Sequence, residues 1–138
     1  YYAKVDTNKA FKAELISHNV TVDEVLTLSR PLQPKGDNPN IVEVVGSRSH
    51  MNQDTLDFVD GLKADGKTVS KGSSLKFCLV AEGKADVYPR YAPTMEWDTA
   101  AGHAICNAVG LKVISKETNK PLAYNKENLL NSYFLVSK

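Results

Sequence analysis

The stretch KTVSKGSSLKFCLVAEGKADVYPR, residues 67–90, contains the alternation of elements that decides the fold class. Its first four residues favour a short strand, and glycine and serine then precede a helix that we expect to turn Leu75, Cys78 and Leu79 inward. A glycine is expected to end this helix, and a second strand follows and ends at a proline. This order of strand, helix and strand is typical of helices packed on a sheet.

The same alternation continues on both sides of this stretch. We expect helices that begin at Asn52 and Leu75 and one that runs from 97 to 109, and strands over residues 41–45, 67–70, 85–88, 111–115 and 133–136. Residues 1–15 are expected to form a hairpin, and residues 16–40 to be irregular apart from a short strand over 25–28. The sequence therefore predicts the α/β class, with a layered sheet and flanking helices.

Composition and charge exclude several classes of function. A chain of 138 residues corresponds to one domain, and 17 basic against 16 acidic residues give a net charge of +1. This balance argues against general binding to nucleic-acid polymers or to a membrane surface. No apolar run approaches the roughly 18 residues of a transmembrane segment. Cys78 and Cys106 are expected to be buried thiols, although two cysteines also permit a disulfide.

Candidate ligand-binding residues lie in the turns where strands end and helices begin, which is where layered α/β sheets bind ligands. Three turns qualify, over residues 46–50, 70–76 and 90–98. The first offers two hydroxyls, a guanidinium and an imidazole, which suit a phosphate or a nucleotide; a polar turn that caps the next helix is the alternative. The second combines Gly72 and Ser73 with the free N–H groups of a helix start, and either binds an anion or is an ordinary N-cap.

The third turn places Arg90 at a strand end and Asp98 at a helix start. Arginine there suits bidentate binding of phosphate. Asp98 is a good N-cap by residue type, and it is also a candidate metal ligand. A single carboxylate is a poor magnesium site, because Mg²⁺ takes near-octahedral oxygen ligands. If Asp98 binds a metal, further ligands must come from elsewhere.

Residues 97–104, WDTAAGHA, resemble the W-D-x-A-A-G-x-A motif of the inositol monophosphatase superfamily. Three further stretches make the chain most similar to the 3′(2′),5′-bisphosphate nucleotidases of the CysQ type within it. They are SRSH at 47–50, GSSLKFC at 72–78 and GKADVYPR at 83–90. The resemblance covers residues 41–138, and residues 1–3 fit the family's central hairpin.

The resemblance implies a Mg²⁺-dependent phosphatase that converts 3′-phosphoadenosine 5′-phosphate to AMP and phosphate by in-line attack of a metal-bound water. Asp98 would be its catalytic metal ligand in this part of the protein. The substrate-binding residues that match the family's motifs are Ser47, Ser49, His50, Ser73, Lys76 and Arg90. The implied partner is a small phosphorylated nucleotide and no nucleic-acid polymer.

The chain departs from the family's pattern in its metal ligands. The family holds the others in a glutamate pair and in an Asp-Pro-(Ile/Leu)-Asp-Gly-Thr motif, and neither occurs in residues 1–138. We therefore expect a single domain that is the C-terminal half of a two-domain enzyme, with residues 1–15 as a hairpin from the domain junction. The enzyme's own N-terminal domain would supply most magnesium ligands. By itself, the chain is not expected to turn over substrate.

Two other functions stay open. One is an inositol- or sugar-phosphate phosphatase of the same superfamily, against which residues 47–50 and 73–76 favour a nucleotide. The other is a non-catalytic nucleotide-binding module, which would bind the ligand without magnesium. The resemblance implies a cytoplasmic protein, with peripheral attachment to the inner membrane as the alternative location.

Overall fold

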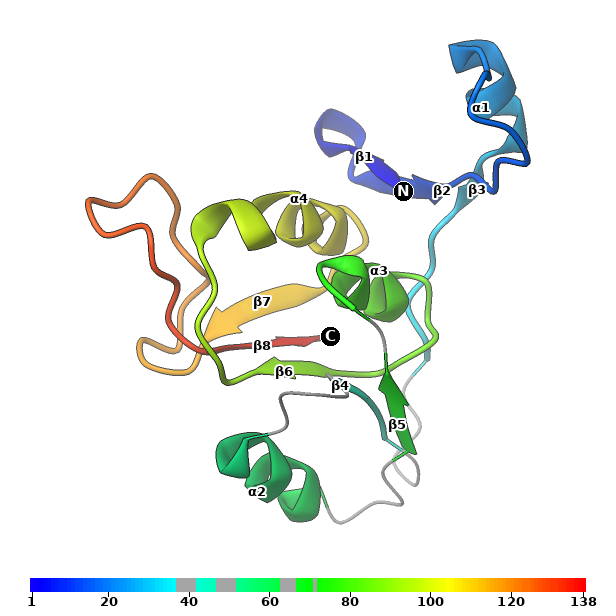
Figure 1. Ribbon diagram of the computed structural model, residues 1–138. Coiled ribbons are helices and arrows are strands. Elements are labelled where there is room, and N and C mark those ends of the chain that lie inside the picture. The colour runs from blue at the N-terminus through cyan, green and yellow to red at the C-terminus, as the bar shows by residue number, and fades with distance from the viewer. Residues whose placement is uncertain (37–41, 47–51, 63–66, 71) are drawn as a thin grey trace.

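The computed structural model describes residues 1–36, 42–46, 52–62, 67–70 and 72–138, arranged as Figure 1 shows. The strands are β1 (Tyr2–Lys4), β2 (Lys9–Lys12), β3 (Arg30–Pro31), β4 (Glu43–Gly46), β5 (Lys67–Ser70), β6 (Tyr88–Arg90), β7 (Lys112–Ser115) and β8 (Phe134–Ser137). The helices are α1 (Val22–Leu28), α2 (Gln53–Gly61), α3 (Leu75–Ala81) and α4 (Glu96–Asn107), and a 3₁₀ turn spans Val5–Thr7. This order confirms the α/β class.

The main sheet follows the order β5-β4-β6-β8-β7. β4 pairs in parallel with β5, and a parallel bridge between Val44 and Val87 joins β4 to the chain directly before β6. β8 pairs antiparallel with both β6 and β7. Four strands therefore run in one direction and β8 in the other. Because β4, β5 and β6 are parallel, their carboxyl ends lie at one edge of the sheet.

Helices cover both faces of this sheet. α3 and α4 lie side by side on one face and α2 lies on the other (Figure 1). The core fills the space between the sheet and the α3–α4 pair, where Phe77 stacks on Phe134 with ring centroids 5.6 Å apart. Tyr88 packs edge-on against both rings. This apolar centre fixes the start of α3 relative to β6, and both elements carry predicted site residues.

The first twelve residues form a hairpin of β1 and β2, and β3 pairs with the other edge of β2. Tyr2 stacks on Phe11 across the hairpin, with ring centroids 5.2 Å apart. The turn of the hairpin ends at Asn8, whose φ of 49° lies in the left-handed region that asparagine tolerates. The place of this hairpin at a domain junction stays a prediction.

The prediction of a strand over residues 25–28 is wrong, because these residues belong to helix α1. Thr21 is the N-cap: its hydroxyl accepts the Glu24 N–H at 3.3 Å, and the Glu24 carboxylate accepts the Thr21 N–H at 2.7 Å. This capping box satisfies two N–H groups that a helix start otherwise leaves free. The four-residue signature Thr-Val-Asp-Glu outweighs the β-branched content of the segment.

Smaller differences concern the centre of the chain. The strand expected over 85–88 runs instead from Tyr88 to Arg90 and includes Pro89, which is tolerated because pairing with β4 has ended at Val87. Leu75, expected inside, is 49% exposed, whereas Cys78 and Leu79 are buried as predicted. Both cysteines are buried and free.

Helix α4 buries Gly102, Ile105 and Ala108, whereas Ala104 is partly buried and Ala101 is exposed. In the ranges that the structure describes, no helix is long and apolar enough to span a lipid bilayer.

Candidate phosphate-binding site

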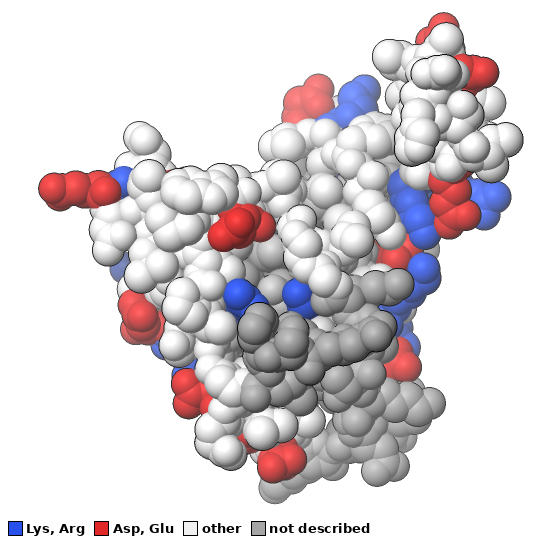
Figure 2. Space-filling model, in the orientation of Figure 1, with Lys and Arg blue, Asp and Glu red and all other residues white. Residues whose placement is uncertain are grey.

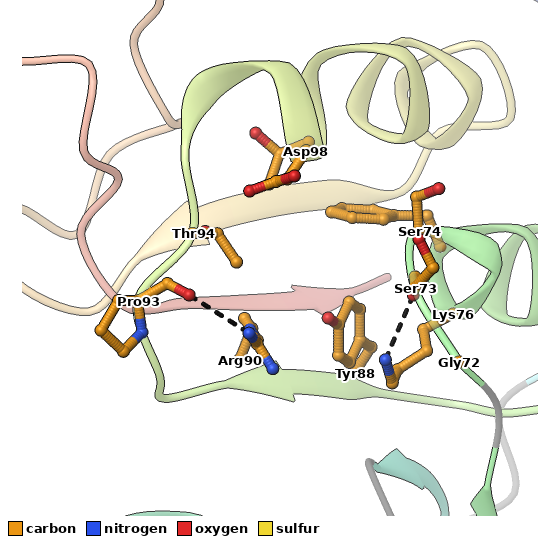
Figure 3. A pocket seen from close by; sticks show the side chains of 11 residues that line it. Gly72, Ser73, Ser74, Lys76, Tyr88, Arg90, Pro93, Thr94 and Asp98 are labelled. Atoms are coloured by element: carbon orange, nitrogen blue, oxygen red, sulfur yellow. Dashed lines mark hydrogen bonds between the residues drawn. The ribbon is translucent and has the colours of Figure 1, made fainter. Parts of the chain in front are cut away.

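A pocket of about 380 Å³ lies where the turn before α3 faces the turn before α4. Its lining comes from the start of α3, from β6 and from the start of α4, as Figure 3 shows. The residues that line it are Gly72, Ser73, Ser74, Lys76, Phe77, Tyr88, Arg90, Pro93, Thr94, Asp98 and Thr99. Two of the three turns predicted from the sequence therefore meet in one cavity, and four of the predicted site residues are among its walls.

Lys76 is the most deeply placed charge of the pocket, with 4% of its surface exposed. Its ammonium donates a hydrogen bond to the Ser73 carbonyl at 3.1 Å and lies 5.4 Å from the centroid of the Tyr88 ring. Burial, together with the positive charge of Arg90, lowers the pKa of Lys76. No carboxylate in the described residues forms an ion pair with it. An anion in the pocket would offset both the burial of the Lys76 ammonium and its repulsion by Arg90.

Arg90 extends from the last position of β6 into the same pocket. Its Nη2 donates to the Pro93 carbonyl at 3.2 Å. Its Nε is buried and has no hydrogen-bond partner among the described residues. A buried donor without a partner costs free energy, and such a group commonly marks the place of a ligand. The guanidinium therefore retains donors for an oxyanion, in the geometry that suits phosphate.

Asp98 faces these two cations from the other side of the pocket (Figure 3). The prediction that Asp98 is the N-cap of its helix is wrong: the N-cap is Met95, and Asp98 is the third residue of α4. It still caps the helix, because its Oδ2 accepts the Met95 N–H at 2.8 Å. Its other oxygen has no hydrogen-bond partner within the described ranges, and the side chain is exposed. One carboxylate thus caps the helix and offers a free oxygen to the pocket.

Figure 2 shows the resulting charge pattern. Basic atoms lie at the floor of a hollow in the middle of this face, and acidic atoms lie above it, on the side of α4. The described part of the chain holds no cluster of three or more histidine, cysteine, aspartate or glutamate residues that could bind a metal ion. Asp98 is the one acidic residue that lines the pocket as described.

The remaining predicted residues differ in what the structure says of them. Ser73 lines the pocket and has a left-handed φ of 52°, an uncommon conformation for a residue with a side chain. Ser47, Ser49 and His50 lie outside the described residues. Gly46, which directly precedes them, borders a second small cavity together with Lys76 and Arg90. The end of β4 therefore lies close to the two cations.

Among the residues of this pocket, the sequence did not single out Tyr88, Thr94 and Thr99. Tyr88 contributes a buried ring, and burial raises its pKa to about 12. Thr94 and Thr99 add hydroxyls on the side of α4. Tyr88 and Thr94 flank Arg90 in the sequence, so the stretch around the predicted arginine was the available signal. Thr99 directly follows Asp98, and its near-complete burial has no local sequence signature.

Residues 3–134 match the model of the inositol monophosphatase family. The chain belongs to the inositol monophosphatase family. This result confirms the resemblance that the WDTAAGHA stretch indicates.

Named members of the family are similar to large parts of the chain. The 3′(2′),5′-bisphosphate nucleotidase CysQ of Escherichia coli strain K12 is 50% identical over 95 residues, which are 68% of this chain and 38% of the relative. The crystal structure of CysQ from Bacteroides thetaiotaomicron superposes with a TM-score of 0.74 at 48% identity, and the match covers 89% of this chain and 46% of that one. The chain therefore spans less than half the length of these family members.

A more distant structure supports the fold. Inositol monophosphatase II from Staphylococcus aureus MSSA476 matches with a TM-score of 0.62 at 20% identity, over 78% of this chain and 40% of that chain. The layered sheet with its flanking helices is thus the inositol monophosphatase fold over the matched part.

Proposed function

We propose that the intact protein containing this chain is a magnesium-dependent phosphatase that hydrolyses 3′-phosphoadenosine 5′-phosphate to AMP and phosphate. This chain would be its C-terminal, substrate-holding half. The observation that carries the proposal is the meeting of Lys76, Arg90 and Asp98 around one pocket, with the buried Arg90 Nε lacking a partner among the described residues. The name of the Escherichia coli relative, which is 50% identical, supports the choice of a bisphosphate nucleotide.

In this proposal the two cations hold phosphate oxygens. Lys76 acts as a buried point charge, and Arg90 presents a planar fork of donors at the end of β6. Ser73, in the turn before α3, adds a hydroxyl at the rim. Ser47, Ser49 and His50 are proposed to complete the nucleotide site from the turn after β4. The Tyr88 ring lies 5.4 Å from the Lys76 ammonium, and the burial of Lys76 strengthens its attraction for an anion.

Asp98 fits one position in a magnesium site. Its free oxygen is the type of ligand that Mg²⁺ prefers, and it faces the cations that would hold the phosphate. Magnesium, when bound, would neutralise phosphate charge and lower the pKa of the attacking water. The other ligands are proposed to come from the rest of the intact protein, and the chain by itself is expected to lack phosphatase activity.

A comparison of substrates tests this function. Phosphate release by the intact protein should be measured with 3′-phosphoadenosine 5′-phosphate and with inositol 1-phosphate, each with and without magnesium. We expect magnesium-dependent release that is faster with the nucleotide. Faster release from inositol 1-phosphate would support the inositol phosphatase alternative. Binding of the nucleotide without magnesium and without turnover would instead support a non-catalytic module.

A further inference from the structure

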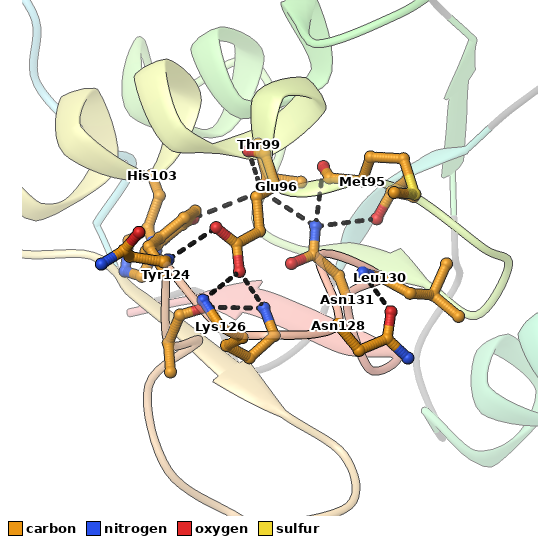
Figure 4. Close-up of polar contacts among 12 residues, drawn as sticks. Met95, Glu96, Thr99, His103, Tyr124, Lys126, Asn128, Leu130 and Asn131 are labelled. Atoms are coloured by element: carbon orange, nitrogen blue, oxygen red, sulfur yellow. Dashed lines mark hydrogen bonds and ion pairs between the residues drawn. The ribbon is translucent and has the colours of Figure 1, made fainter.

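Asn131, which lies outside the pocket lining, makes several contacts to the start of helix α4. Its side chain is 5% exposed, and its Nδ2 lies 2.9 Å from the Met95 carbonyl oxygen, 3.1 Å from Thr99 Oγ1 and 3.2 Å from Thr94 Oγ1. Its backbone N–H also donates to the Thr94 carbonyl at 2.8 Å. One buried amide therefore joins three residues around the first turn of α4, and Figure 4 shows its contacts with Met95 and Thr99.

Two of these contacts act on residues of the pocket itself. Thr94 and Thr99 line the pocket on either side of Asp98 in the sequence. The third, to Met95, reaches Asp98 through the backbone: Asn131 holds the Met95 carbonyl, and the Met95 N–H holds Asp98 Oδ2 at 2.8 Å. The orientation of the Asp98 carboxylate therefore depends on where Met95 is held.

The orientation of the Asn131 amide follows from its partners. A carbonyl oxygen only accepts hydrogen bonds, so the amide must turn its NH₂ group toward Met95. Asn131 Oδ1 is then buried without a partner among the described residues. The three contacts of Nδ2 therefore set the orientation of the amide.

The segment around Asn131 anchors the helix start at further points. The Glu96 N–H donates to the Leu129 carbonyl at 3.0 Å, and Met95 bridges Leu130 as an antiparallel pair. The Glu96 carboxylate accepts the Asn125 N–H at 2.7 Å and pairs with the Lys126 ammonium, whose hydrogen bond lowers the pKa of Glu96. Residues 125–131 thus clamp the first turn of α4 from outside the pocket.

We propose that Asn131 is a positioning residue, which fixes the free oxygen of Asp98 toward the pocket by holding Met95 and the two threonines. Its role in turnover rests on the proposed phosphatase function. The contact chain from Asn131 through Met95 to Asp98 stands on the geometry of the described residues.

The test uses Asn131→Asp in the intact protein. The variant keeps the shape of the side chain, removes both donors and sets an oxygen against the Met95 carbonyl. Asn128→Asp is the matched control: it lies in the same segment, is exposed, and its Oδ1 accepts the Leu130 N–H, a contact that aspartate retains. Asn131→Ala, which adds no buried charge, carries the same expectation if Asn131→Asp does not fold.

The first measurement is amide hydrogen exchange at Met95, whose N–H reports directly on the Asp98 carboxylate. We expect the Met95 amide to exchange at least about tenfold faster in Asn131→Asp, while amides of β7 and β8 stay within about twofold and Asn128→Asp matches the parent. Equal acceleration of all amides would overturn the proposal, because Asn131 would then stabilise the whole fold and would not act on Met95 in particular.

The second measurement separates kcat from KM for 3′-phosphoadenosine 5′-phosphate. We expect kcat to fall by about tenfold or more and KM to change by less than about threefold, because the cations that hold the substrate are untouched. An unchanged kcat together with faster exchange at Met95 would reject a role in turnover. If the unsubstituted protein shows no phosphatase activity, the proposed function fails, and the exchange at Met95 still decides whether Asn131 positions Asp98.

Discussion

Gly102 of α4 faces the ring of Phe77 of α3 so closely that a β-carbon on Gly102 would lie 2.5 Å from Phe77 Cδ2. Real Cβ contacts essentially never reach that distance, so glycine is needed for the approach of the two helices. Phe77 directly follows Lys76 in the sequence, and Asp98 lies one turn before Gly102 in α4. This contact therefore sets the separation between the two walls of the pocket.

Replacing Gly102 with alanine should destabilise the protein despite the higher helix propensity of alanine. The added methyl group must displace the Phe77 ring, which is 1% exposed and packed against Phe134. Overpacking of this kind costs about 1–3 kcal/mol, to be measured as the free energy of unfolding in urea. Gly61→Ala is the control, because nothing lies within 4 Å of a β-carbon at that helix end. Equal stability of the two variants would contradict the close approach of α3 and α4.

Removal of either pocket cation should weaken binding of the nucleotide. We expect Lys76→Ala and Arg90→Ala each to lower the affinity for 3′-phosphoadenosine 5′-phosphate by about tenfold to a hundredfold, since hydrogen bonds to charged groups contribute about 1.5–3 kcal/mol. Calorimetry on the intact protein measures this. Lys112→Ala, an exposed lysine on β7, serves as the control for the loss of one positive charge. Unchanged affinity in both pocket variants would remove the proposed anion site.

The affinity should also depend on the protonation of Lys76. Burial and the nearby Arg90 lower its pKa from the ordinary 10.5, so the free protein loses this proton at a lower pH than an exposed lysine does. A bound phosphate favours the charged form and raises the pKa again. Affinity should therefore be highest below the lowered pKa and should fall as the pH rises through it.

Calorimetry over a range of alkaline pH checks this dependence. In Lys76→Met the fall in affinity should disappear. Arg90→Ala should keep the fall but move it to a higher pH, because Lys76 still titrates and has lost the positive neighbour that lowers its pKa. The same decline in Lys76→Met as in the parent would show that another group titrates.

The sequence allowed the layered fold and the two described turns of the site to be predicted, because both depend on local signals. The strand and helix order from residue 42 onward follows from apolar periodicity and from glycine and serine at the turns, and Asn52 caps α2 as expected. The meeting of Lys76, Arg90 and Asp98 followed from the resemblance and from the rule that strand ends gather at one edge.

What could not be predicted depends on contacts between distant segments. Asn131 lies 32 residues from Thr99 in the sequence, so no periodicity points to their hydrogen bond. Helical spacing predicts Leu75 in the core, but it is the first residue of the seven-residue helix α3 and is 49% exposed. Asp98 has the residue type of an N-cap, yet it caps from the third position, because the helix begins before Trp97 at Glu96.

Magnesium-dependent phosphate release from 3′-phosphoadenosine 5′-phosphate by the intact protein and by its Asp98→Asn variant tests the central claim most directly. Asparagine keeps an oxygen for the Met95 N–H and so preserves the helix cap, but it removes the charge that a metal requires. We expect the parent to release phosphate only with magnesium, and Asp98→Asn to be slower by about a hundredfold or more. Asp60→Asn, an exposed acid on α2, should keep the parent rate. Equal rates in the parent and Asp98→Asn would contradict the account.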